Sequence, residues 1–436
     1  MKATVSVLLA LLLLASPLAA IAAAQEDEVE IQRDLQVEVK TGSTERFGGG
    51  DWIRIDVGST TFAVLYGNET NPNFPKIVAE YDRYLGAAEI YNESEELLKT
   101  MPIPVRTIMI QSFEMMVEFK DGNDDGLMHF PRSLSPIDLL SDSIDLPRKL
   151  LVLRQSWSLE DLVITEDENV TAVDFNITAT NLDYTLVGPF DDPGDGLDRI
   201  TFSFHIRVEL VETTLDVPVY KIVVAEDRGI ISSDVNRTET LTGMTVNGTF
   251  KYDHYIEGWD WGGDDSRLAL STHLIVGTHV PPPVWKWLHL QFDPHARDEG
   301  GVDYHNESLG ESPTLITADK MVFEDDWERI GRIRWVSGVE VDGVMQEMYF
   351  QLHRVERLLG FERLFAGVLF GGAFIYPQGN VIFHDPTLDA SVFVPGGQII
   401  SEVLPGLAPY FIQAVVAGLV VVGLVLFRTF RGRSGS

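Results

Sequence analysis

Residues 121–126, with the sequence Asp-Gly-Asn-Asp-Asp-Gly, carry oxygen-bearing side chains at a spacing that suits calcium. Asp121, Asn123 and Asp125 stand at alternate positions, and Gly126 permits the tight turn that brings such oxygens together. The twelfth position holds Arg132 where an EF-hand requires a bidentate glutamate, so the segment is not an EF-hand. We therefore predict either a structural calcium site completed by a distant carboxylate or an acidic hairpin turn.

A second acidic turn, at residues 258–265, places two tryptophans beside three carboxylates. Indole rings can stack on a sugar while carboxylates bind its hydroxyl groups or an ion. In the alternative interpretation, one tryptophan packs in the core and the acids are solvated at a hairpin. The candidate ligand-binding residues in this turn are Trp259, Asp260, Trp261, Asp264 and Asp265.

Sequence patterns of well-known catalytic sites are missing from the chain. It contains no cysteine, which excludes disulfides, thiolate metal sites and cysteine nucleophiles. It also lacks a His-Glu-x-x-His pair, a Gly-x-Ser-x-Gly turn, a phosphate-binding loop and a dinucleotide fingerprint. With 66 acidic residues, clusters such as residues 324–326 do not indicate paired catalytic carboxylates. The chain is therefore predicted to hold no catalytic residue that its sequence reveals, and no cofactor other than structural calcium.

Alternation of apolar and polar residues dominates the middle of the chain and predicts strands with one buried face. The clearest strands are residues 51–57, 171–180, 202–208 and 267–276. Turn-forming pairs separate the apolar runs at residues 121–122, 125–126, 262–263 and 342–343. Helical pattern is sparse, with candidates at residues 75–84, 94–100 and 136–140.

This pattern predicts a mainly β fold, an antiparallel β-sandwich ectodomain built as one large sandwich or two packed ones. Residues 364–376 are thirteen apolar residues with three glycines, too short for a helical span. They predict a buried hairpin that turns at Gly371 and Gly372, or a segment on the outer leaflet. The predicted divisions are an N-terminal β-rich region at 25–280, a C-terminal β-rich region at 281–385 and a membrane-proximal stalk at 386–406.

The two ends of the chain indicate export and membrane anchoring. Residues 1–24 combine a positive start, a short apolar run and small residues before a cleavage site, as in a secretory signal peptide. Residues 407–427 are uncharged and apolar, and at about 1.5 Å per residue they match a hydrocarbon core of about 30 Å. The basic tail, residues 428–436, is then cytoplasmic by the positive-inside rule. The predicted topology is a single transmembrane helix with an extracellular ectodomain at the cell membrane.

Glycosylation signals and charge agree with an exported ectodomain. Seven Asn-x-Ser/Thr sequons without proline predict N-glycosylation at Asn68, Asn92, Asn169, Asn176, Asn236, Asn247 and Asn306. Without Lys2 and the three tail arginines, 29 basic residues face 66 acidic ones, a net charge of about −37. This charge excludes electrostatic capture of nucleic acid. With so few lysines, it indicates an archaeal surface that is either salt-adapted or acidic at ordinary ionic strength.

These features support three classes of function. The first is a non-enzymatic surface glycoprotein for adhesion, ligand binding or envelope structure, whose partners are membrane lipid and glycans or other surface proteins. The alternative is a membrane-tethered extracellular carbohydrate-active enzyme or solute-binding domain with residues 258–265 at its mouth. The third is a membrane-remodelling or fusion protein that uses residues 364–376, which would then be exposed at a tip.

Overall fold

The computed structural model describes residues 37–44, 49–122, 124–128, 145, 147–167, 169–188, 194–225, 229–279, 303–305, 320–324, 329–335, 338–360 and 365–395. Within these ranges the chain forms strands and no helix, so the predicted mainly β class is confirmed. No helix that could cross a bilayer occurs within them; residues 1–24 and 407–427, the predicted signal peptide and span, lie outside. The strands are β1 (Val37–Thr44), β2 (Gly50–Val57), β3 (Thr60–Tyr66), β4 (Lys76–Tyr91), β5 (Leu97–Lys120), β6 (Pro147–Val152), β7 (Ser158–Asp167), β8 (Val170–Leu182), β9 (Leu186–Val187), β10 (Leu197–Ala225), β11 (Gly229–Trp259), β12 (Ser266–His279), β13 (Asp303–His305), β14 (Lys320–Glu324), β15 (Arg329–Arg334), β16 (Gly338–Val341), β17 (Val344–Glu347), β18 (Tyr349–Gly360), β19 (Phe365–Tyr376), β20 (Val381–His384) and β21 (Thr387–Pro395).

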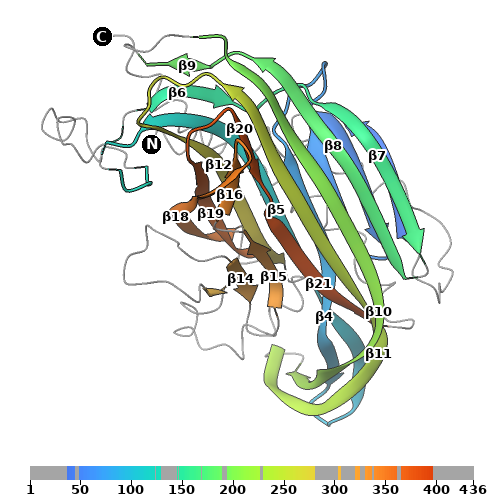
Figure 1. Cartoon of the computed structure of the whole chain (residues 1–436). Coiled ribbons are helices and arrows are strands. Elements are labelled where there is room, and N and C mark those ends of the chain that lie inside the picture. Colours follow the sequence, from blue (N-terminus) through green and yellow to red (C-terminus); the bar gives the residue numbers. More distant parts are fainter. Residues whose placement is uncertain are drawn as a thin grey trace, which may run out of the picture.

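Fourteen of the described strands form two hydrogen-bonded sets, and the shorter strands β6, β9 and β13–β17 attach to their edges. One set runs β1-β2-β3-β4-β5-β12-β19-β18. The other runs β7-β8-β10-β11, and β11 then pairs with β20 and β21. The sets join where residues 87–91 of β4 pair in parallel with residues 219–223 of β10, and the other pairings among the described strands are antiparallel. Figure 1 shows β10 and β11 running together as one long ribbon that bends at its far end.

The hydrophobic core lies between the two sets, because alternate side chains of each strand point inward. Phe62 of β3 meets Phe250 of β11 with ring centroids 5.3 Å apart, and Phe113 of β5 meets Phe202 of β10 at 4.8 Å. All four rings are almost fully buried. Such aromatic pairs add about 0.5–1.5 kcal/mol each beyond the area they bury, so they hold the two sets together.

Strands from both predicted β-rich regions pair with one another. The strand β19 lies between β12 and β18, while β20 and β21 pair with β11. Leu388 and Val392 of β21 are buried in the same core cluster as Phe62. Residues 387–395, which we predicted to belong to the stalk, are therefore a strand of the folded body.

Two helix predictions are wrong. Residues 75–84 fall mainly in β4, where Ile77, Ala79 and Tyr81 are fully buried at every second position, as a strand requires. Residues 94–100 form a turn and the start of β5, and the Asn92 side chain accepts hydrogen bonds from the backbone of Ser94 and Glu96. The third candidate, residues 136–140, lies outside the described residues.

The predicted turn at Gly371 and Gly372 is also wrong. Both glycines lie inside β19, which continues without interruption and pairs on both sides. A Cβ atom at position 372 would lie 2.6 Å from the Phe350 ring, so this glycine makes room for a neighbouring side chain. Residues 369–376 are buried, as the hairpin interpretation predicted, so these eight residues are not exposed as the leaflet interpretation required. By contrast, the turn at Asp342 and Gly343 joins β16 to β17 as predicted.

Candidate functional site

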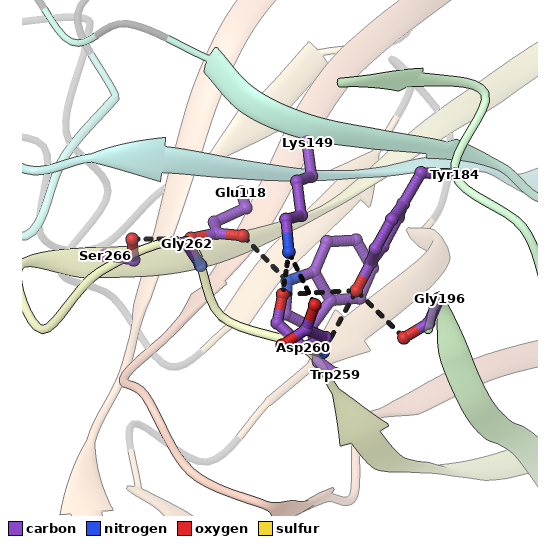
Figure 2. A network of polar contacts seen from close by, with 8 residues as sticks. All are labelled: Glu118, Lys149, Tyr184, Gly196, Trp259, Asp260, Gly262 and Ser266. Carbon is purple, nitrogen blue, oxygen red and sulfur yellow. Dashed lines mark hydrogen bonds and ion pairs between the residues drawn. The ribbon is translucent and has the colours of Figure 1, made fainter. Parts of the chain in front are cut away.

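The turn between β11 and β12, which holds the predicted ligand-binding residues, is built on a buried carboxylate (Figure 2). Glu118 of β5 is 0% exposed and accepts three hydrogen bonds. The donors are Trp259 Nε1 at 3.1 Å, the Gly262 backbone N–H at 2.7 Å and Ser266 Oγ at 2.6 Å. Because all three donors belong to the turn or to its edges, Glu118 fixes the conformation of the turn against the sheet.

A second polar group holds the other side of the same turn. The Lys149 ammonium, on a side chain only 1% exposed, donates to Asp260 O at 2.5 Å and to Asp260 Oδ2 at 2.9 Å. It also lies 5.0 Å from the centroid of the Tyr184 ring, a cation–π distance. The Tyr184 hydroxyl donates to Gly196 O at 3.0 Å and accepts from the Asp260 N–H at 3.0 Å. Burial raises the pKa of Tyr184, so this hydroxyl keeps its proton and remains a donor.

The two tryptophans of the turn have different environments. Trp259 is 3% exposed and meets Tyr184 edge to face at 4.9 Å, so its indole belongs to the core. Trp261 is half-buried, and its Nε1–H donates to Gly379 O at 2.8 Å. Of the two rings, only that of Trp261 is partly open to solvent.

The three carboxylates of the turn form its exposed rim. The Asp260 and Asp265 side chains are 43% and 45% exposed, and Asp264 is exposed. Asp265 pairs with Arg148 at 2.7 Å and with Lys120 at 3.2 Å. Any ligand at this turn would meet these acids and the exposed part of Trp261, a surface suited to hydroxyl groups or cations. Ligand binding at this turn stays a prediction.

The predicted calcium loop is closed by hydrogen bonds and a guanidinium group. Asp121 accepts from the backbone N–H groups of Asp125 at 3.2 Å and Gly126 at 2.9 Å. Arg267 Nε donates to the same carboxylate at 2.6 Å. Asn123 lies outside the described residues, among which no group of three or more His, Asp or Glu side chains could hold a metal ion. Calcium at this loop stays a prediction, and the ion would have to share Asp121 with Arg267.

Replacing Arg267 by methionine is expected to lower the free energy of unfolding by about 2 kcal/mol, because the nearly buried Asp121 carboxylate would lose its cation. Urea denaturation measures the loss. The control Arg199→Met, which breaks an exposed ion pair with Glu257, should lower the free energy of unfolding by less than about 1 kcal/mol.

Calcium should restore the stability of R267M if the loop binds the ion. A melting temperature of the unmodified chain that EGTA leaves unchanged would remove the calcium prediction.

None of the sequon asparagines that the structure describes is buried. Asn169 and Asn236 are exposed, Asn306 lies outside the described residues, and the half-buried ones are Asn68, Asn92, Asn176 and Asn247. Several donate through Nδ2 to a nearby carboxylate, as Asn236 does to Glu89 at 3.2 Å. A glycosidic bond at Nδ2 leaves one N–H on that atom, so glycosylation is compatible with these contacts.

A polar row across β4, β5 and β12 was not foreseen from the sequence. Lys76, Ser112 and His273 are direct cross-strand partners, so their side chains share one face. Glu114 accepts from Ser112 Oγ at 3.2 Å and lies 3.1 Å from His273 Nδ1. Burial lowers the pKa of Lys76 to about 8, although the charge of Glu114 acts in the opposite direction. Ser112 is 2% exposed and directs its proton to Glu114, so the row is held as part of the sheet.

A second unforeseen group lies deep in the core. Tyr376 Oη is 3.0 Å from His254 Nδ1 and 3.1 Å from His384 Nδ1, and all three side chains are buried. Only the register of β11, β19 and β20 could reveal this group, since scattered histidines carry no sequence pattern.

No protein-family model matches the chain, and no curated protein is similar to it in sequence.

Proposed function

We propose that the chain is a membrane-anchored cell-surface glycoprotein, with a β-sandwich ectodomain that serves adhesion, ligand binding or envelope structure on the outside of an archaeal cell. The observation that carries this proposal is the position of the sequons: all six described asparagines lie at or near the surface of a well-packed β fold. The two strand sets around one aromatic core support the sandwich. Membrane lipid, through residues 407–427, is one partner; glycans or other surface proteins are the others.

The acidic turn favours binding or structure over catalysis. The polar atoms of the supporting side chains make contacts within the protein, and these contacts fix the turn. The supporting side chains are those of Glu118, Lys149 and Tyr184. A partner would meet the exposed rim of carboxylates beside Trp261, in which Asp260 also pairs with Lys149 and Asp265 with Arg148 and Lys120. Such a rim suits recognition of a glycan or of a protein surface.

The test is expression of the full chain in an archaeal host that performs N-glycosylation. We expect the chain in the membrane fraction, with an electrophoretic mobility that chemical deglycosylation increases. Asn169→Gln and Asn236→Gln should each remove one glycan mass, whereas Asn380→Gln, at an exposed asparagine outside any sequon, should remove none. External protease on intact cells should destroy the ectodomain and protect only the predicted span and tail. A soluble, unmodified chain with residues 1–24 still attached would overturn the proposal.

A further inference from the structure

Three side chains in the centre of the core each have one polar atom that makes no hydrogen bond with any described residue. The atoms are Gln111 Oε1 of β5 and, on β11, Tyr252 Oη and His254 Nε2, and all three side chains are 0% exposed. Nearly all buried polar atoms in proteins are hydrogen-bonded to protein or to ordered water, because an unpaired one keeps the full cost of its desolvation. These three atoms therefore call for a partner.

The orientation of the Gln111 amide is fixed by its neighbour Thr272 of β12. The Thr272 hydroxyl has one proton, which it donates to Ser112 O at 3.0 Å. A lone pair of the same hydroxyl accepts from Gln111 Nε2 at 3.2 Å. Since the amide nitrogen faces Thr272, the amide oxygen is the atom that stays unpaired, and it can only accept a hydrogen bond.

The Tyr252 hydroxyl lies beside this amide. Burial raises the pKa of Tyr252 and the nearby Gln111 amide opposes that rise, yet no hydrogen bond of good geometry joins the two groups. The Phe113 ring, two residues after Gln111 on the same face of β5, has its centroid 5.5 Å from that of Tyr252 and 5.2 Å from that of His254. Because burial keeps the phenol protonated, Tyr252 is a donor close to an acceptor with which it makes no bond.

His254 uses only one of its ring nitrogens within the protein. Its Nδ1 lies 3.0 Å from Tyr376 Oη. Burial holds the pKa of His254 well below the ordinary value, so the imidazole is neutral, with one N–H and one bare nitrogen. The Nε2 atom is therefore a donor or an acceptor according to the tautomer, and in both tautomers it is unpaired.

We propose that a water molecule is bound in the core between β5 and β11, where it donates to Gln111 Oε1, accepts from Tyr252 Oη and makes a third hydrogen bond with His254 Nε2. Buried waters typically make about three hydrogen bonds to groups that would otherwise be unpaired. A water molecule has two protons and two lone pairs, so it matches this acceptor, this donor and the imidazole nitrogen in either tautomer.

This water joins the two strand sets by polar contacts across the core. The strand β5 belongs to the first set and β11 to the second, and the path runs from Gln111 through the water to His254. From His254 it continues to Tyr376 of β19, whose hydroxyl also lies 3.1 Å from His384 Nδ1 of β20. Since each hydrogen bond has a defined partner, a satisfied buried network of this kind specifies how one set lies against the other.

X-ray radiolysis of the full chain in detergent tests for the water, because hydroxyl radicals formed from a bound water oxidise the side chains beside it. The matched control is Tyr81, which is also 0% exposed and whose hydroxyl lies 4.0 Å from Met109 Sδ. We expect Tyr252 to be oxidised at least about threefold faster than Tyr81, as measured by mass spectrometry of the digested protein. Equal rates for the two tyrosines would overturn the proposal.

The variant Gln111→Met refines the same experiment, because methionine has a similar length but no acceptor oxygen. The rate of Tyr252 oxidation should fall toward that of Tyr81. An unchanged rate would show that Gln111 does not hold the water and would overturn the assigned site.

Tyr252→Phe tests the proposal through the sign of its effect on stability. If the hydroxyl had no partner, phenylalanine would remove an unsatisfied polar group, and the urea midpoint would rise. If the hydroxyl donates to the water, phenylalanine removes a hydrogen bond and leaves the water with two partners, so we expect the midpoint to fall. A midpoint of Y252F equal to or above that of the unmodified chain would contradict the bound water.

Discussion

Replacement of Glu118 by alanine is expected to lower the free energy of unfolding by about 4 kcal/mol, because three hydrogen-bond donors lose one shared acceptor. The indole N–H of Trp259 and the hydroxyl of Ser266 lie in buried residues, where water does not readily replace the carboxylate. Each unsatisfied buried polar group costs about 1–3 kcal/mol, and alanine also leaves a cavity. The backbone N–H of Gly262, nearer to solvent, adds a smaller share.

Urea denaturation followed by tryptophan fluorescence measures this loss. Glu118→Gln keeps one carbonyl acceptor at the same place and should lose less than half as much as E118A. The matched control is Glu239→Ala, at a glutamate that is 51% exposed, which should change stability by no more than about 0.5 kcal/mol. If E118A were as stable as E239A, the carboxylate would not be what fixes the turn between β11 and β12.

The acidic turn itself could be predicted from the sequence, but the residues that hold it in place could not. Gly262 and Gly263 mark the reversal between two alternating segments, and the turn indeed joins β11 to β12. Glu118, however, is 141 residues from Trp259 in the chain and is one of 66 acidic residues, so nothing local distinguishes it. The same holds for Lys149, whose role depends on β6 lying beside β5. The site therefore depends on the pairing register of strands that are far apart in the sequence.

Alternation predicted most of the strands because a strand with one buried face repeats every two residues. It failed at residues 75–84, where Ala79, Glu80 and Arg83 suit a helix as well as a strand. Pairing with neighbouring strands determines the structure in such cases, because β4 lies between β3 and β5 and is hydrogen-bonded to both. Gly371 and Gly372 misled for a different reason, since both lie inside β19 and not in a turn, and Gly372 gives space to Phe350.

The stability of the protein is expected to fall as the pH decreases below about 6.5, because His254 cannot be protonated without disrupting the core. Its side chain is completely buried, and burial, with a smaller contribution from His384, holds its pKa well below the ordinary value. Its Nδ1 faces the Tyr376 hydroxyl, whose own pKa burial raises, so this neighbour stays neutral and offers no compensating charge. The rings of Phe113, Phe202 and Phe374 surround the imidazole in T-shaped contacts.

The sign of the effect follows from proton binding. Below the unfolded-state pKa of about 6.5, the unfolded chain binds a proton at His254 and the folded chain does not, so acid favours unfolding. Each pH unit in this range should remove up to about 1.4 kcal/mol of the free energy of unfolding, until the pH reaches the folded-state pKa.

Urea midpoints at pH 7.5, 6.5 and 5.5, at constant high salt to screen the surface acids, measure how the free energy of unfolding changes with pH. His254→Phe keeps an aromatic ring in the same packing and should remove about one proton from that slope. Equal slopes for H254F and the unmodified chain would show that this buried imidazole is not the acid-sensitive group.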